Sequence, residues 1–205
     1  MGNRFAELAF TPSVRAVQES MGSRSHFAGF ERGPASHRDL GPDETEFIQT
    51  RDTFYMASVS ETDWPYVQHR GGPVGVLKVL DTNTVGFADY RGNHQYVSVG
   101  NVLKNDRVAL ILVDYPNRLR LKLLGHVRIV PSTEADLLAS LGTPGYKARI
   151  ERGFTIKVAA YDWNCPQHIT PRFTRAELEP DIKPLMARIA ELEQQVKDQR
   201  APDHR

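Results

Sequence analysis

The chain has 205 residues, of which 40% are hydrophobic and 25% are charged, so it has the composition of a globular protein long enough to bury a core. Its 26 basic and 25 acidic residues leave a net charge of +1, which disfavours nucleic acid or an anionic membrane as a general partner. The single cysteine, Cys165, excludes an intramolecular disulfide and cannot form a zinc site alone, so we expect no metal site.

No part of the sequence predicts a membrane segment or a secretion signal. A run of about 18 apolar residues, which a membrane-spanning helix requires, does not occur. The N-terminal residues also lack the continuous apolar stretch of a signal peptide. We therefore expect a soluble, cytoplasmic protein.

The first 50 residues are expected to form short helices and a polar arm. A Thr-Pro pair is typical of a helix start and Gly22 of a helix end, which predicts a helix over residues 12–22. The polar, glycine-rich stretch 23–41 is interpreted as a loop or arm. A second short helix is expected to begin at Pro42, with acidic residues in its first turn.

From residue 51 the pattern changes to that of short strands. Segments rich in β-branched and aromatic residues alternate with turn-forming stretches such as ETDW, residues 61–64. This density of hairpins predicts an antiparallel barrel or sandwich. We expect strands over 53–60, 65–70, 74–80, 84–90, 107–113, 118–130 and 154–163.

One of these strands, 118–130, has a basic face. Arg118, Arg120 and Lys122 alternate with leucines, the period-two pattern of a strand with one buried face. Such a face is commonly the solvated side of an edge strand, and that reading stands beside a role in anion binding.

Two more helices are expected nearer the C-terminus. Thr133 and Asp136 resemble a capping box, and Gly142 marks the end of that helix. The last helix carries Ile182, Leu185, Ile189, Leu192 and Val196 at alternating spacings of three and four. Because proline is tolerated in the first turn, Pro184 sets its predicted start near Asp181. Its narrow apolar stripe predicts packing on the barrel or pairing with a second copy.

The stretch PYVQHRGGP, residues 65–73, ends a predicted strand on three polar side chains. Gln68, His69 and Arg70 precede Gly71 and Gly72, which allow another group to approach the backbone closely. A binding cleft would explain this ending, whereas an ordinary surface strand is the alternative.

A second polar segment, residues 87–101, joins a predicted strand to a helical stretch. Its loop is rich in polar groups, and a helix N-terminus with free N–H groups favours negative charge. A phosphate site and a plain polar turn are both compatible with this pattern. The polar side chains are Asp89, Arg91, Asn93, Gln95 and Ser98.

Three separated segments carry a family resemblance: FYMASVSETDWPYVQHRGG, VGFADYRGNHQYVSVGNVLKNDRVALILVDYPNRLRLKLLGHVRI and YDWNCPQHITPR. In order and spacing they resemble the FMN-binding split-barrel proteins related to pyridoxamine 5′-phosphate oxidase. The resemblance implies a mainly β (α+β) fold, a split antiparallel β-barrel with peripheral helices. It places the barrel domain at 51–173, between N-terminal helices and a polar arm at 1–50 and a C-terminal amphipathic helix and tail at 174–205.

The resemblance also implies a cofactor site. FMN would lie in a cleft between two protomers of a homodimer, with Arg120 where relatives set a polar side chain against the flavin. Trp163 and Arg172 match an aromatic residue and an arginine that complete the site from the other subunit. No catalytic residue is implied. The cofactor-binding residues implied by the first two segments are Gln68, His69, Arg70, Asp89, Arg91, Asn93, Gln95 and Ser98.

The chain departs from the vitamin B6 oxidases themselves. Those enzymes carry an arginine and a lysine where this chain has Gln68 and an altered Arg70-Gly71-Gly72 turn, and they end on an arginine-and-histidine motif where it has NCPQHITPR. The resemblance therefore supports FMN binding more strongly than it supports the vitamin B6 reaction.

We expect an FMN-dependent oxidoreductase that takes electrons from NADH, NADPH or another reductant and acts on an unidentified small molecule. The alternatives are a non-catalytic flavin carrier or sensor, a protein whose pocket holds haem or a deazaflavin, and a dimerisation module without a cofactor.

Overall fold

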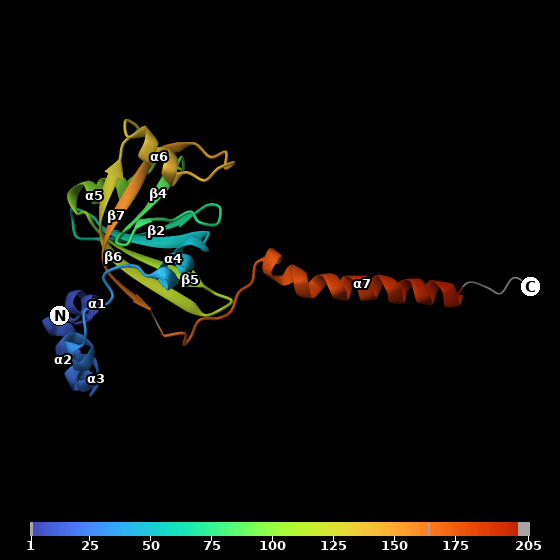
Figure 1. Cartoon of the computed structure of the whole chain (residues 1–205), viewed down its shortest axis with the longest axis horizontal. Helices are drawn as coiled ribbons and strands as arrows, with labels where there is room; N and C mark the ends of the chain where they lie inside the picture. Colours follow the sequence, from blue (N-terminus) through green and yellow to red (C-terminus); the bar gives the residue numbers. More distant parts are fainter. Residues whose placement is uncertain (1, 164, 201–205) are drawn as a thin grey trace, which may run out of the picture.

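The computed structural model describes residues 2–163 and 165–200. Its centre is a seven-stranded sheet in the order β2-β1-β5-β6-β7-β4-β3, in which all strand pairs are antiparallel (Figure 1). Strands β2 and β3 are the two edges, so the barrel stays open between them. The predicted mainly β fold and split antiparallel barrel are confirmed. The strands are β1 (Thr53–Val59), β2 (Pro65–Gly71), β3 (Lys78–Asp81), β4 (Thr84–Tyr90), β5 (Arg107–Asp114), β6 (Leu119–Val130) and β7 (Ile150–Trp163).

The core lies inside the curved sheet. On β5, residues facing inward alternate with more exposed ones, and Leu110 and Leu112 are fully buried. Phe87 stacks on Phe154 with ring centroids 5.0 Å apart and meets Phe54 edge-on at 5.1 Å. Each of these phenylalanines is buried, which contributes about 2–3 kcal/mol per side chain.

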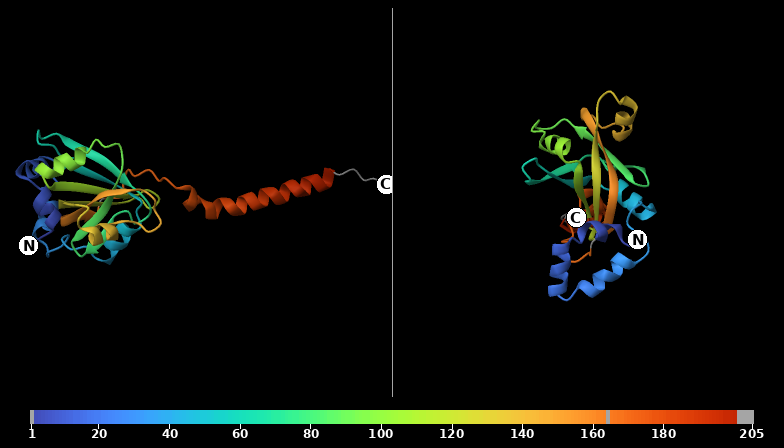
Figure 2. Two further views of the ribbon diagram at one scale, coloured as in Figure 1. Left: turned by 90° about the horizontal axis from the view of Figure 1, so that it is seen from above. Right: turned by 90° about the vertical axis from the view of Figure 1, so that its left-hand side faces the viewer.

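The helices cover the sheet unevenly. Helices α1 to α3 gather at one end of the sheet, whereas α7 projects away from it (Figures 1 and 2). On α5, Asn101 is buried and its side-chain amide donates to Ser58 Oγ of β1 at 3.0 Å, which fixes the helix to the sheet. The helices are α1 (Arg4–Ala9), α2 (Pro12–Ser20), α3 (Arg24–Arg32), α4 (Pro42–Gln49), α5 (Val97–Lys104), α6 (Ala135–Leu141) and α7 (Arg175–Arg200).

The structure corrects the N-terminal arm. The stretch expected to be a loop or arm contains α3, which forms despite its polar and glycine-rich sequence. Phe27 of this helix packs on Phe10 with ring centroids 5.4 Å apart. Arg24 forms a 2.6 Å ion pair with Glu31, which lies about two turns later in the same helix. Tertiary contacts therefore override the local turn signals here.

Two other predicted boundaries also change. Strand β3 begins at Lys78 rather than at residue 74, because Gly75 takes a turn conformation with φ of 77° and its N–H donates to the carbonyl of Arg51. Helix α6 ends at Gly142 as predicted, but Glu134 occupies its N-cap without a side-chain hydrogen bond, so the predicted capping box is wrong.

Helix α7 begins earlier than predicted. Thr174 and Glu177 form a capping box, in which each side chain accepts the other residue's backbone N–H, at 3.2 and 2.7 Å. This start places both Pro180 and Pro184 inside the helix, so the inference of a start near Asp181 is wrong. The capping box sets the start of α7 upstream of both prolines, and the helix continues through them.

Candidate functional site

A cavity of about 310 Å³ lies between β2, β4, the loop after β4 and the first turn of α5. It is the place where the two polar segments of the sequence meet. Helix α5 points its N-terminus into the cavity, while β2 and β4 supply its walls. The sequence-predicted residues that line it are Gln68, His69, Arg70, Asp89, Asn93, Gln95 and Ser98.

The alternation of side chains along β2 explains how this strand contributes polar groups to the cavity. Tyr66, Gln68 and Arg70 are the less exposed residues of this strand and share one face. The Tyr66 hydroxyl donates to Gln68 Oε1, and Gln68 Nε2 donates to the His69 carbonyl at 3.3 Å, so the amide is held in one orientation. The ring of His69 packs edge-on against Tyr55 at 5.4 Å.

An ion-pair cluster forms one wall of the cavity. Arg70 Nη1 donates to Asp89 Oδ1 at 2.5 Å, and Arg152 Nε lies 3.5 Å from Asp89 Oδ2. Arg152 also pairs with Glu151 at 3.0 Å. Burial raises the pKa of Asp89, and the two arginines oppose that rise. The cluster holds two cations and two anions, so it carries little net charge.

Three buried polar atoms on the cavity side chains have no hydrogen-bond partner in the described structure. They are Arg70 Nε, Tyr90 Oη and Ser98 Oγ. Buried polar groups are normally satisfied, so these atoms are candidates for hydrogen bonds to a ligand or solvent in the cavity. Ser98 is 4% exposed and lies in the first turn of α5.

The first turn of α5 is uncapped. Its N-cap residue, Tyr96, has a left-handed backbone with φ of 52° and makes no capping hydrogen bond through its side chain. The first N–H groups of a helix have no partner within the helix, and the helix dipole adds positive potential there. The first backbone N–H groups of α5 are therefore available to donate hydrogen bonds to a ligand in the cavity.

Aromatic and basic side chains form the cavity mouth. The rings of His94 and Tyr96 stack with centroids 5.6 Å apart, and the Arg152 guanidinium lies 4.8 Å from the Tyr96 ring. Arg91 hydrogen-bonds to His94 Nε2 at 3.1 Å and does not line the cavity itself. Residues at or beside the cavity that were not predicted from the sequence are His94, Tyr96, Tyr90, Tyr66, Glu151 and Arg152.

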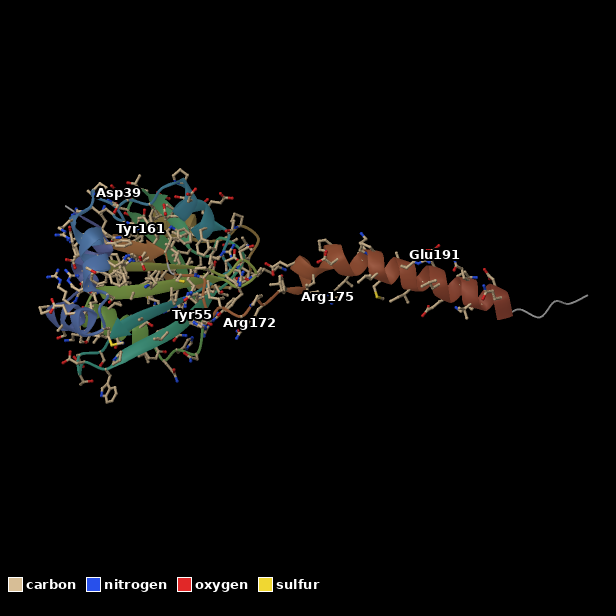
Figure 3. The ribbon with its side chains drawn as sticks, turned by 90° about the horizontal axis from the view of Figure 1, so that it is seen from below. Asp39, Tyr55, Tyr161, Arg172, Arg175 and Glu191 are labelled. Atoms are coloured by element: carbon tan, nitrogen blue, oxygen red, sulfur yellow. The ribbon has the colours of Figure 1, made fainter. Side chains whose placement is uncertain are left out.

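Besides Arg91, three sequence-predicted residues lie outside this cavity in the described chain. Arg120 donates to the carbonyl of Cys165 at 2.9 Å, and Trp163 Nε1 donates to Glu44 Oε1 at 2.7 Å. The Arg172 guanidinium lies 5.0 Å from the Tyr115 ring, in the segment that leads to α7 (Figure 3). Their role in the site of a second protomer stays a prediction.

Within residues 2–163 and 165–200, no group of three or more His, Cys, Asp or Glu side chains is placed to hold a metal ion. No helix in these ranges combines the length and the hydropathy needed to cross a membrane.

Known structures share parts of this architecture. A putative pyridoxamine 5′-phosphate oxidase from Lactobacillus delbrueckii is 16% identical, with a TM-score of 0.46 over 60% of this chain and 93% of that one. HupZ of Group A Streptococcus is 12% identical, with a TM-score of 0.46 over 65% and 100%. An FMN-binding protein from Syntrophomonas wolfei is 11% identical, with a TM-score of 0.42 over 75% and 97%.

No curated protein matches the chain. The family model described as pyridoxamine 5′-phosphate oxidase matches residues 41–161, from the start of α4 to near the end of β7. This range includes every residue that lines the cavity. Because the match spans more than half of the 205 residues, the chain belongs to the pyridoxamine 5′-phosphate oxidase family.

Proposed function

We propose that this protein binds FMN in the cavity at the N-terminus of α5 and acts as an oxidoreductase on a small molecule. The observation that carries the proposal is the group of unpartnered polar atoms there, Arg70 Nε, Tyr90 Oη and Ser98 Oγ. The family of the chain and the uncapped first turn of α5 support the same site.

A phosphate monoester suits the donors of this site. The Ser98 hydroxyl and the first N–H groups of α5 offer hydrogen bonds that a dianionic phosphate accepts strongly. The ion-pair cluster is close to neutral, so the attraction depends on these donors, the helix dipole and nearby Arg91 rather than on surplus charge in the wall. The residues present therefore fit the phosphate end of FMN.

The remainder of FMN would extend beyond the phosphate donors. A cavity of about 310 Å³ is at the lower end of the usual range for ligand sites, roughly 300–1,000 Å³. This size supports a site that a second protomer completes, as the family resemblance implies for a homodimer. The fixed amide of Gln68 would then offer a hydrogen bond to the cofactor from the β2 wall.

Bound FMN would supply the hydride and electron transfer, for which NADH or NADPH is the proposed reductant. The chain itself would hold the phosphate through Ser98 and α5 and orient the ring along β2. The stacked rings of His94 and Tyr96 would limit access at the mouth.

Titration of the purified chain with FMN should show saturable quenching of flavin fluorescence. We expect Ser98→Ala to weaken binding about tenfold, because it removes one hydrogen bond to a charged acceptor. The matched control is Ser140→Ala, whose exposed hydroxyl bonds only the carbonyl of Leu137 on α6, and its affinity should equal that of the unaltered chain.

Three outcomes would contradict parts of this proposal. Absence of FMN binding, or a haem absorption band in the purified protein, would exclude the cofactor assignment. Equal affinities for Ser98→Ala and Ser140→Ala would exclude the phosphate position at α5. A chain that retains FMN but oxidises neither NADH nor NADPH would be a flavin carrier or sensor rather than the proposed oxidoreductase.

A further inference from the structure

Helix α7 carries an apolar stripe that nothing in its own chain covers. The helix spans 26 residues and projects from the barrel in Figure 1 and in the left view of Figure 2. Ile182, Leu185, Ile189, Leu192 and Val196 are each between 43% and 63% exposed. Packing on the barrel of the same chain, one of the two arrangements predicted from the sequence, is therefore not what the structure shows.

The identities along the stripe follow a heptad. With Ile182 at an a position, the a and d positions form one seam along the helix. Isoleucine or valine at a with leucine at d is the combination that favours parallel, two-stranded coiled coils. The a residues are Ile182, Ile189 and Val196, and the d residues are Leu178, Leu185 and Leu192.

The two prolines agree with this seam. In the same heptad Pro180 occupies an f position and Pro184 a c position, both on the side of the helix away from the a and d residues. The local loss of backbone hydrogen bonds therefore falls on the solvent face. The contacts along the seam can remain continuous past both residues.

Charge then selects the orientation of the partner. In a parallel pair, a g residue faces the e residue five positions later on the other helix, which sets Arg188 opposite Glu193. An antiparallel pair with the six apolar layers overlapped would instead set Arg188 opposite Arg188, and Glu179 opposite Glu193. Figure 3 shows α7 extending beyond the barrel, with Glu191 well along it.

We propose that α7 pairs with α7 of a second copy of this chain as a parallel, in-register coiled coil. A parallel pair starts both helices at the same end, so the two barrels are neighbours. An antiparallel pair would separate the two helix starts by roughly 39 Å, given 1.5 Å per residue over 26 residues. The proposal rests on α7 alone and is independent of flavin binding.

The test is disulfide capture in the full chain carrying Cys165→Ser, which removes its only native thiol. Gln199→Cys places one cysteine at the next d position, where it would face its copy only in the parallel register. Gln194→Cys is the matched control at an outward f position. We expect the d-position thiols to cross-link about a hundredfold faster, because pairing gives them an effective concentration of the order of millimolar.

A second substitution distinguishes pairing through α7 from association through contacts between the two barrels. Ile189→Glu puts like charges into the middle of the seam, and we expect it to reduce Gln199→Cys cross-linking to the rate of the Gln194→Cys control. Ala187→Glu, which puts the same side chain on the outer face, should leave the cross-link unchanged. Equal rates at the two cysteine positions, or a cross-link that persists with Ile189→Glu, would overturn the proposal.

Discussion

Replacing Arg70 with methionine is expected to lower the free energy of unfolding by about 3 kcal/mol at about pH 7. Methionine keeps much of the apolar contact that Arg70 makes above the rings of Phe87 and Phe154, where its guanidinium lies at 5.5 and 5.6 Å. The substitution therefore removes mainly the 2.5 Å ion pair with Asp89. That carboxylate is buried, and Arg152 would be its remaining cationic neighbour.

The loss should shrink in acid. Burial already raises the pKa of Asp89 in the folded chain, and without Arg70 that pKa rises further because an opposing cation is gone. The folded state then takes up a proton at a higher pH than the unfolded chain does. Stability of the variant consequently increases as the pH falls from the raised pKa toward the ordinary aspartate range, so we expect a smaller difference from the unaltered chain at about pH 5.

Arg128→Met is the matched control for Arg70→Met. Arg128 pairs with Glu134 at 2.6 Å, a similar distance, but both side chains are largely exposed. Its loss should cost less than about 1 kcal/mol, with no comparable change between the two pH values. Urea unfolding of both variants measures the effect, and equal losses of stability would show that the buried Arg70–Asp89 pair contributes no more than an exposed ion pair.

The sequence predicted the barrel because its signals are local. Alternating apolar residues and turn-forming stretches report each strand separately, and an antiparallel sheet joins such strands through short connections. The same locality identified Arg70 at the end of β2 and Ser98 at the start of α5. Each stands beside glycine or a helix start, which are features that a single segment displays.

The rest of the cavity depends on pairing between distant segments. Arg152 reaches Asp89 because β4 and β7 pair in a register that sets these two residues opposite each other. No pattern around Arg152 distinguishes it from the other basic residues on strands. The positive φ values of His94 and Tyr96, which shape the mouth, are likewise set by the loop as a whole.

Helix propensities gave the wrong boundaries where contacts or caps compete with them. Helix α3 forms because its aromatic face has neighbours in the N-terminal unit, for example Phe10 beside Phe27. Helix α7 begins upstream of Pro180 because Thr174 and Glu177 cap it there, and the helix continues through both prolines. A prediction from helix-breaking residues alone considers neither the aromatic contacts of α3 nor the capping box of α7.

Glu44→Ala is expected to lower the free energy of unfolding by about 3 kcal/mol, because it removes two hydrogen bonds to one buried carboxylate. Glu44 Oε2 accepts the backbone N–H of Gly41 at 2.9 Å and so caps α4, while Oε1 accepts Trp163 Nε1 at 2.7 Å. Trp163 also packs edge-on against Phe47 at 4.8 Å. The carboxylate thus joins α4 to the end of β7.

Glu46→Ala is the matched control on the same helix, where an exposed glutamate should contribute no more than about 0.5 kcal/mol. Urea unfolding followed by tryptophan fluorescence suits both variants, since Trp163 reports directly on the junction. Loss of the Glu44 carboxylate frees the indole N–H, so the emission of the folded variant should also shift. If the two variants unfold alike, Trp163 does not depend on α4 for its position, and a role for it in the cofactor site of a partner subunit becomes the better explanation of its place in the fold.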